Sequence, residues 1–83
     1  MSSARSYEPT LDRFVRDMRA KLAKPENVAK PHWRQCDLQF LVGRLEDELE
    51  ELKNAIDEGS KKSIRLECAD IANFAMMISD WHR

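Results

Sequence analysis

Two pairs of acidic residues could act together as a metal-binding site. Glu48 and Glu51 lie in the acidic stretch RLEDELEEL (residues 44–52), and Glu67 and Asp70 follow after fifteen intervening residues. In a helix, residues three apart lie on the same face, so each pair would present two carboxylates in one direction. Carboxylates that converge repel one another, and a hard divalent cation relieves that repulsion. A set of four carboxylates favours Mg²⁺ or Mn²⁺ over zinc.

The sequence predicts an all-α fold for a single domain of 83 residues. Only two glycines and three prolines interrupt the chain, and no strand-like alternation appears. A first helix is indicated by apolar residues at helical spacing, namely Leu11, Phe14, Val15, Met18 and Leu22. Thr10 is available as its N-cap, and residues 1–9 are expected to be flexible. The helix should end near Lys24, because Pro25 disfavours helical backbone in the residue before it.

A long second helix should begin at Asp37 or Leu38, after a connector over residues 25–35. It carries a continuous apolar stripe formed by Leu38, Leu41, Val42, Leu45, Leu49, Leu52 and Ile56. Gly59 is a natural residue to follow a helix end, so this helix should end just before it. The short turn GSKK then leads to a third helix, from about Lys62 to the C-terminus. Because the turn is short, the second and third helices must form an antiparallel hairpin.

Helical geometry divides the acids of the second helix into two sets. At about 100° per residue, Glu46 and Glu50 fall opposite the apolar stripe and should be solvated. Glu48 lies at the edge of the core, and Glu51 lies beside it one turn further along. Glu48 and Glu51 are therefore expected to face the third helix.

The third helix carries Glu67, Asp70 and Asn73 within a segment that is apolar nearly all round. A helix of that kind is normally buried, and carboxylates are almost never fully buried unless they are paired or bind a metal. One interpretation is that nearby cations neutralise the acids singly; the candidates are Arg44, Lys53, Lys61, Lys62 and Arg65. The interpretation that we favour is that the two acidic pairs converge and hold a metal ion.

Composition limits the classes of protein to which this chain can belong. A domain this short buries only about 60% of its unfolded surface, whereas 42% of its residues are hydrophobic. We therefore expect a homo-oligomeric helical bundle, either a homodimer or a tetramer. The formal net charge of −1, from 14 basic and 15 acidic residues, gives no electrostatic basis for nucleic-acid binding.

The same sequence features argue against a membrane or secreted protein. The longest apolar run, from Phe74 to Ile78, is too short to span a bilayer. The N-terminal residues lack the apolar region of a signal peptide. Cys36 and Cys68 are expected to be reduced thiols, which places the protein in the cytoplasm.

The two acidic blocks resemble the motif of the MazG-like, all-α nucleoside triphosphate pyrophosphohydrolases, in which EExxE is followed by ExxD. Here the first block reads DELEE (residues 47–51), so that Asp47 takes the place of the first glutamate. The second block reads ECAD (residues 67–70), and the spacing between the blocks is typical of that family. The resemblance covers roughly residues 33–81.

The resemblance implies an enzyme that uses Mg²⁺ to hydrolyse nucleoside triphosphates between the α and β phosphates. The products would be a nucleoside monophosphate and pyrophosphate, in keeping with nucleotide-pool housekeeping. By similarity, the Mg²⁺ ligands would be Glu48, Glu51, Glu67 and Asp70. Asn73 would be a polar residue near the triphosphate or the sugar. Glu48 or Glu51, if not fully committed to the metal, could serve as the catalytic base.

Basic and aromatic residues outside the acidic blocks are candidates for binding the substrate. No glycine-rich phosphate loop is present, so the outer phosphates would need basic side chains; the candidates are Lys53, Lys61, Lys62 and Arg65. Trp33 could stack on the nucleotide base, or it could cap the end of the helical core.

Two other functions are compatible with the same residues. The acids could merely solubilise a non-catalytic helical dimerisation module. Alternatively, the chain could be a related hydrolase that acts on phosphoribosyl-ATP or dUTP, because such enzymes share this general architecture. Release of pyrophosphate from a nucleoside triphosphate distinguishes the enzymes from the module.

Overall fold

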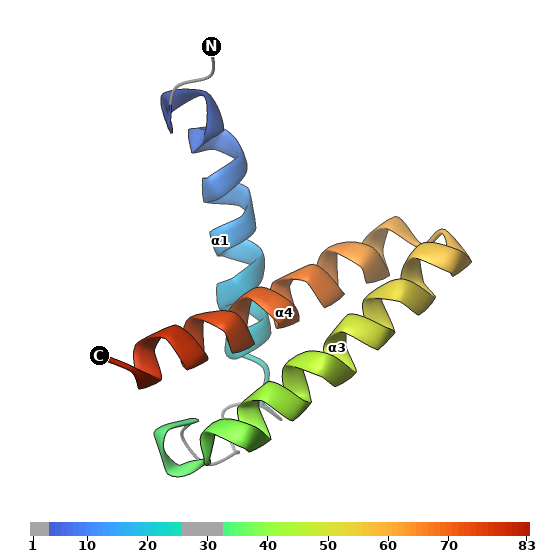
Figure 1. Cartoon of the computed structure of the whole chain (residues 1–83). Coiled ribbons are helices and arrows are strands. Elements are labelled where there is room, and N and C mark those ends of the chain that lie inside the picture. Colours follow the sequence, from blue (N-terminus) through green and yellow to red (C-terminus); the bar gives the residue numbers. More distant parts are fainter. Residues whose placement is uncertain (1–3, 26–32) are drawn as a thin grey trace.

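A computed structural model describes residues 4–25 and 33–83 of the chain, and this part is all-helical (Figure 1). Its three α-helices are α1 (Glu8–Leu22), α3 (Leu38–Glu58) and α4 (Lys61–Trp81). Short 3₁₀ turns precede α1 and α3, at Ala4–Tyr7 and Trp33–Gln35. The predicted all-α class is confirmed. Within the described residues, no helix is both long enough and apolar enough to cross a membrane.

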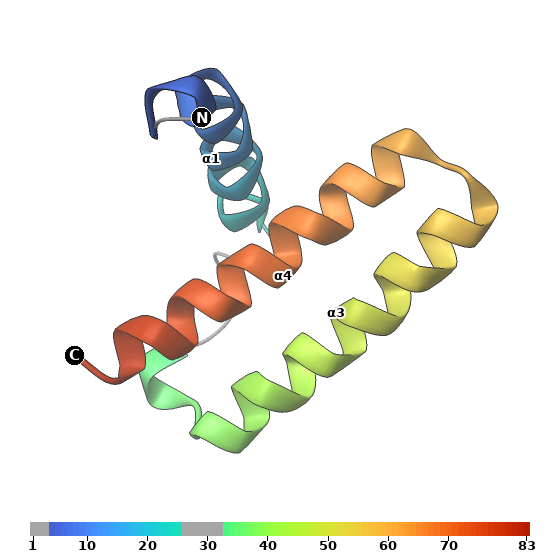
Figure 2. The same cartoon turned by 45° about the horizontal axis from the view of Figure 1, so that its top comes forward.

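The hairpin of α3 and α4 forms because each helix end carries a local signal. The Asp37 carboxylate accepts a hydrogen bond from the backbone N–H of Phe40 (2.7 Å) and caps the start of α3. Gly59 ends α3 in the left-handed conformation (φ 74°), which a residue without a Cβ adopts easily. The Ser60 hydroxyl then accepts from the N–H of Ser63 and caps α4. The two helices therefore lie antiparallel and side by side (Figures 1 and 2).

The α1 helix crosses α4 instead of lying along the hairpin (Figures 1 and 2). Its C-terminal end contacts α4, whereas its N-terminal half projects away from the hairpin. Two polar contacts hold the crossing: the side-chain amide of Asn73 donates to the carbonyl of Met18 (3.1 Å), and Lys21 Nζ lies 3.1 Å from Asp70 Oδ2. The projecting half leaves apolar side chains such as Leu11 exposed.

The ends of α1 differ from those that the sequence predicts, whereas α3 has its predicted ends. The α1 helix begins at Glu8, ahead of the predicted cap Thr10. Pro9 fits the first turn of a helix, because the N–H that it lacks would have no helical partner there. The helix ends at Leu22, two residues earlier than expected. Residues 1–3 and most of the predicted connector lie outside the described part of the chain.

Among the described residues, the core is small and contains two polar side chains. Its buried apolar residues are Leu41, Ala55 and Ala69, and beside them Glu48 and Asn73 expose only 4% and 3% of their surface. The α4 helix is for the most part half-buried, because α3 and one end of α1 cannot cover all its apolar sides. Burial of a carboxylate next to so few apolar residues is costly unless it has partners.

Candidate metal centre

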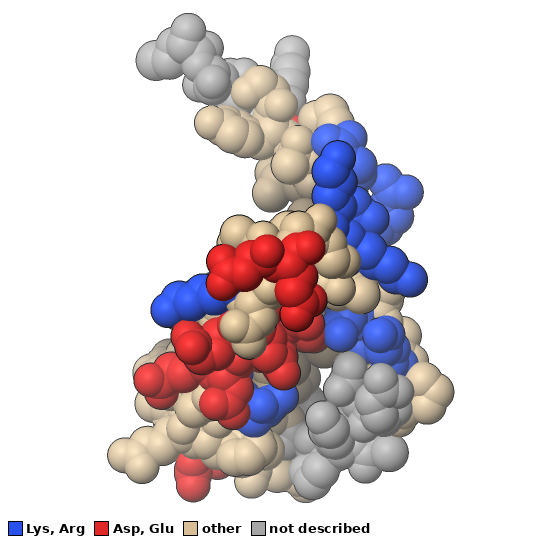
Figure 3. All heavy atoms as spheres, turned by 90° about the vertical axis from the view of Figure 1, so that its right-hand side faces the viewer, with Lys and Arg blue, Asp and Glu red and all other residues tan. Residues whose placement is uncertain are grey.

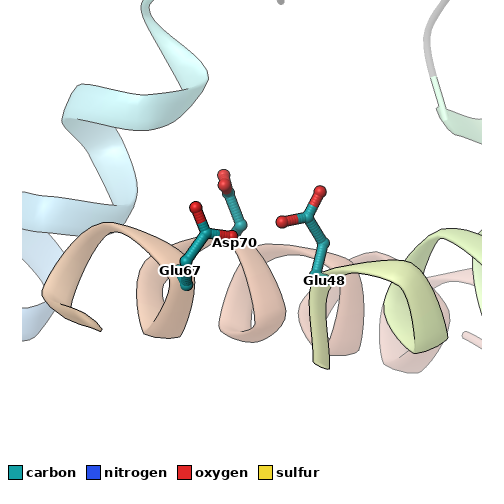
Figure 4. Close-up of side chains that lie close together, drawn as sticks. All are labelled: Glu48, Glu67 and Asp70. Carbon is teal, nitrogen blue, oxygen red and sulfur yellow. The ribbon is translucent and has the colours of Figure 1, made fainter. Parts of the chain in front are cut away.

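Carboxylates from α3 and α4 meet on one side of the hairpin. Glu48 extends from α3, and Glu67 and Asp70 extend from α4 (Figure 4). One oxygen from each of these three side chains lies within 4.8 Å of the others. The spacing of three residues places Glu67 and Asp70 on one face of α4, and the antiparallel packing of α3 brings Glu48 next to them. The structure therefore brings together three of the four predicted metal ligands.

The fourth predicted ligand, Glu51, lies at the exposed edge of the same group. Its carboxyl lies close enough to those of Glu48 and Glu67 for both to affect its pKa. The contact with Glu48 lowers the pKa of Glu51, so that Glu51 is ionised at neutral pH. We refer to Glu48, Glu51, Glu67 and Asp70 together as the acidic cluster.

Two buried oxygens of the acidic cluster have no hydrogen-bond donor among the described residues. They are Glu48 Oε2 and Glu67 Oε2. A buried acceptor without a donor costs about 1–3 kcal/mol. A proton on one of these carboxyls, or a cation bound between them, would give the two buried oxygens a partner and so stabilise the cluster.

Protonation is one way in which the cluster lowers this cost. Burial raises the pKa of Glu48 to about 8, and the neighbouring carboxyls of Glu51 and Glu67 act in the same direction. Burial also raises the pKa of Glu67 above its usual value. A protonated Glu48 can donate a hydrogen bond to a neighbouring carboxylate, which an ionised Glu48 cannot do. The metal-free cluster therefore retains a proton at neutral pH.

Two basic residues offset part of the negative charge. Arg44 donates to Glu48 Oε1 (2.9 Å) and forms a second ion pair with Asp47 (3.1 Å). Lys21, from α1, pairs with Asp70. Burial of Lys21 disfavours its charged form, but the hydrogen bond to Asp70 and the charge of the cluster outweigh burial and raise the pKa of Lys21. Among the described residues, two cations thus face four carboxyl groups, and negative charge remains in excess.

The donor set of the cluster fits a hard divalent cation. All its candidate ligand atoms are carboxylate oxygens, which suit Mg²⁺ or Mn²⁺. Arg44 and Lys21 engage Glu48 Oε1 and Asp70 Oδ2, and they leave the second oxygen of Glu48 available. A cation bound between α3 and α4 would satisfy the buried oxygens and balance the remaining charge.

The other residues predicted to bind substrate lie in several places. Asn73 is buried where α1 crosses α4; its Nδ2 donates to α1, and its Oδ1 has no donor among the described residues. Lys53 is exposed and pairs with Glu50 (3.2 Å) away from the cluster. Lys62 and Arg65 are exposed near the start of α4. Within the described part of the chain, none of these three basic residues forms an ion pair with the acidic cluster.

Trp33 lies near the C-terminal end of α4 and not beside the acidic cluster. It lines a hollow of about 380 Å³ together with Met76, Ser79, Asp80 and Arg83. The neighbouring Arg34 pairs with Asp80 (2.6 Å) and ties this turn to α4. At about 1.5 Å per residue, Asp80 lies roughly 15 Å along α4 from Asp70. This placement supports the interpretation of Trp33 as a cap on the end of the hairpin.

Lys21 and Arg44 belong to the site, but the sequence does not single them out. Spacing identifies Arg44 only as one of five possible counter-charges, and Lys21 stands far from the acids along the chain. One signal for Lys21 is present, however. It follows Phe14 by seven residues and Met18 by three, so it falls on the strip of α1 that packs against α4.

The chain belongs to the same family as an uncharacterized protein of Archaeoglobus fulgidus. The two sequences are 32% identical over 76 residues, which cover 87% of this chain and 81% of the archaeal protein. No protein-family model and no solved structure matches the chain.

Proposed function

We propose that this protein is a cytoplasmic, Mg²⁺-dependent nucleoside triphosphate pyrophosphohydrolase that serves the nucleotide pool. It would cleave between the α and β phosphates and release a nucleoside monophosphate and pyrophosphate. The observation that carries the proposal is the convergence of Glu48, Glu67 and Asp70, with two buried oxygens that lack donors among the described residues. The order and spacing of the acidic blocks, which resemble those of MazG-like enzymes, support this choice of reaction.

Glu48, Glu67 and Asp70 would hold the Mg²⁺ ion, or Mn²⁺ in its place, with Glu51 at the edge. When bound, the ion neutralises phosphate oxygens and lowers the pKa of a coordinated water. The carboxylates of the chain add selectivity, because they repel a triphosphate that arrives without a metal ion. The acidic cluster would therefore accept the metal complex of the substrate and reject the free anion.

Glu51 is the better candidate of the two glutamates for the catalytic base. It is exposed, and its lowered pKa keeps it ionised at neutral pH, ready to accept a proton. Glu48 is buried, is bonded to Arg44 and retains a proton in the metal-free protein. We therefore assign metal binding to Glu48 and proton transfer from the attacking water to Glu51.

Lys21 and Arg44 would act as positioning residues. Each engages one oxygen of a candidate ligand, Lys21 at Asp70 and Arg44 at Glu48. These contacts fix the side-chain rotamers of the ligands before a metal binds, as supporting residues do around metal sites. The same ion pairs are the observation that supports the alternative function, a non-catalytic dimerisation module in which the acidic cluster is purely structural.

The site would lie within a homodimer or a dimer of two dimers. Val42, Leu49 and Ile56 follow one another at seven-residue spacing along α3 and expose 40%, 47% and 55% of their surface. Apolar residues at this spacing are typical of helices that pack lengthwise against another helix. A second copy of α3 is the proposed partner. A monomeric mass in light scattering at micromolar concentration would contradict this assembly.

The test of the activity is a screen of the purified chain against canonical and damaged nucleoside triphosphates, dUTP and phosphoribosyl-ATP. We expect release of pyrophosphate, and not of orthophosphate, that requires Mg²⁺ and stops when EDTA is added. Glu46→Gln is the matched control, because Glu46 is an exposed acid of α3 outside the cluster. It should turn over as fast as the unaltered chain. No turnover on any substrate, with no Mg²⁺ binding in calorimetry, would establish the module instead.

A further inference from the structure

A second charged site lies on another side of α4. A groove of about 530 Å³ between α1 and α4 is lined by Arg13 and Arg16 from α1 and by Arg65 from α4. At about 100° per residue, Arg65 falls roughly opposite the faces of α4 that carry Glu67 and Asp70. Figure 3 likewise shows basic side chains gathered along α1, apart from the acidic side chains over the hairpin. We refer to this site as the arginine groove.

Within residues 4–25 and 33–83, the guanidinium groups of the arginine groove form no ion pair with a carboxylate. Among the described residues, Arg16 and Arg65 make no hydrogen bond or ion pair, and Arg13 donates only to the hydroxyl of Thr10 (3.3 Å). Asp17 also lines the groove, yet within the described part of the chain it pairs with none of these arginines. Three cations and one unpaired carboxylate therefore leave the groove with a positive excess.

This excess cannot be removed by loss of a proton, because a guanidinium stays charged at any ordinary pH. Lys61 and Lys62, exposed one turn before Arg65, add to the positive potential. The first turn of α4 contains no acidic residue that would oppose them. An anion bound from solution would reduce the repulsion among these charges. A phosphate group suits arginine best, because its oxygens accept paired N–H donors from the planar guanidinium.

The lining between the arginines is apolar. Phe14, Ile64 and Cys68 form it, and the volume of the groove lies in the range of small-molecule sites, about 300–1,000 Å³. Inorganic phosphate alone would leave this lining in contact with water. A ligand that joins a phosphate to a planar ring would engage both the arginines and the aromatic side chain of Phe14.

We propose that the arginine groove is a nucleotide-binding site, separate from the acidic cluster, in which the arginines hold the phosphate and the apolar lining holds the base. Binding in the groove needs no metal ion, because the charge of the site is already opposite to that of the ligand. The proposal therefore does not depend on the hydrolysis proposed for the acidic cluster.

The test is a calorimetric titration of the metal-free full chain with AMP in EDTA at low salt. We expect binding that weakens as salt is added, since the contact is between exposed charges. Arg16→Gln and Arg65→Gln should each lower the affinity by about tenfold, the loss of one charge-assisted contact. Arg19→Gln is the matched control: Arg19 is exposed on the same helix, outside the groove, and its replacement removes the same charge. It should change the affinity by less than about twofold.

Adenosine and inorganic phosphate are the two further ligands. Adenosine has the base but no phosphate for the arginines, and inorganic phosphate has no base for the apolar lining. Both should bind more weakly than AMP. The proposal is overturned if AMP does not bind, if adenosine binds as tightly as AMP, or if Arg19→Gln weakens binding as much as the groove variants do. Circular dichroism of each variant confirms the fold, and the two groove substitutions lie on different helices, so that either one alone decides the outcome.

Discussion

The acidic cluster and the arginine groove lie on different sides of α4, and they accommodate excess charge in different ways. Carboxylates can bind a proton, and burial raises the pKa of Glu48 to about 8, so that this residue does so at neutral pH. The arginines of the groove cannot release theirs. The cluster can therefore adjust its own charge in the absence of a ligand, whereas the charge of the groove changes only when an anion binds.

Burial adds a second difference between the two sites. Glu48 is buried, and the chain supplies Arg44 and Lys21 as partners for the cluster. The arginines of the groove are exposed, so water and salt screen their mutual repulsion. Repulsion in the cluster should consequently be large and dependent on pH, and repulsion in the groove should be small and dependent on salt.

The largest effect is expected when the centre of the cluster loses one charge. Glu67→Gln keeps the shape of the side chain and removes a candidate ligand whose Oε2 has no donor among the described residues. Turnover should fall by at least about a hundredfold, or roughly 2.7 kcal/mol in transition-state stabilisation. Mg²⁺ affinity should fall with it, as measured by calorimetry, while the metal-free melting temperature should stay the same or rise.

Glu67 is preferred to Asp70 for this test because Asp70 has an ion pair to lose, that with Lys21. Replacement of Asp70 would mix the loss of a ligand with the loss of a structural contact. If Glu67→Gln instead melts far below the unaltered chain and binds Mg²⁺ as before, the cluster is structural and its proposed contrast with the groove is wrong.

Metal-free stability should fall as pH rises from about 5 to 8. Burial raises the folded-state pKa of Glu48 to about 8, and it also raises that of Glu67 above the usual value for a glutamate. Between these pH values the folded state binds more protons than the unfolded chain does. The bound protons stabilise the folded state fully below the unfolded-state pKa. This stabilisation is lost as pH rises through the folded-state pKa. The melting temperature in EDTA should drop by several degrees over this range.

Mg²⁺ should restore this stability at pH 8, because it binds the folded cluster better than the unfolded chain. Glu48→Gln is the control, since an amide at this position does not titrate, and its melting temperature should depend less on pH. A melting temperature that rises between pH 5 and 8 in EDTA would show that the carboxylates of the cluster are well paired without a metal.

The ion pair between Lys21 and Asp70 should contribute measurably to stability. Lys21→Met leaves a half-buried carboxylate without its partner and should lower the free energy of unfolding by about 2 kcal/mol. Lys53→Met is the matched control, because Lys53 pairs with Glu50 in the open, where ion pairs contribute about 0–1 kcal/mol. Urea denaturation of both variants measures the difference. If both variants lose the same free energy of unfolding, the ion pair between Lys21 of α1 and Asp70 stabilises the fold no more than an exposed ion pair does.

The part of the fold that could be predicted from the sequence is the part that local signals determine. Asp37 and Gly59 act within a few residues of themselves, and they define the ends of α3 correctly. The convergence of the acids follows from helical spacing and a short turn. The crossing of α1 could not be predicted in this way, because it depends on contacts between residues far apart in sequence, such as Asn73 with Met18.

The same reasoning explains which site residues escaped prediction. Lys21 enters the cluster only because α1 crosses α4 at that point. The arginine groove joins Arg65, which the sequence analysis names as a candidate phosphate ligand, to Arg13 and Arg16, which it does not single out and which lie more than forty positions earlier in the chain. Arg13 and Arg16 are three residues apart in the sequence, but that spacing does not show that Arg65 lies opposite them or that no described carboxylate pairs with them.

The smallest effect should come from Arg65, and Arg44 is the arginine in contrasting surroundings with which it is compared. Arg65 has Lys61 and Lys62 one turn before it and lies near the positive end of α4, so its charge is unfavourable there. Arg65→Gln should therefore raise the free energy of unfolding by about 0.3 kcal/mol, or roughly 2 °C in melting temperature, at low salt. The gain should vanish at high salt, where these charges are screened. Arg44→Gln should have the opposite sign, because it leaves Glu48 without its charged partner. Both variants are compared by thermal denaturation in EDTA at low and high salt. If Arg65→Gln destabilises the chain as Arg44→Gln does, Arg65 forms a stabilising ion pair within the chain. Its guanidinium group would then not be available to bind an anion, and the proposed contrast between the two sites would be wrong.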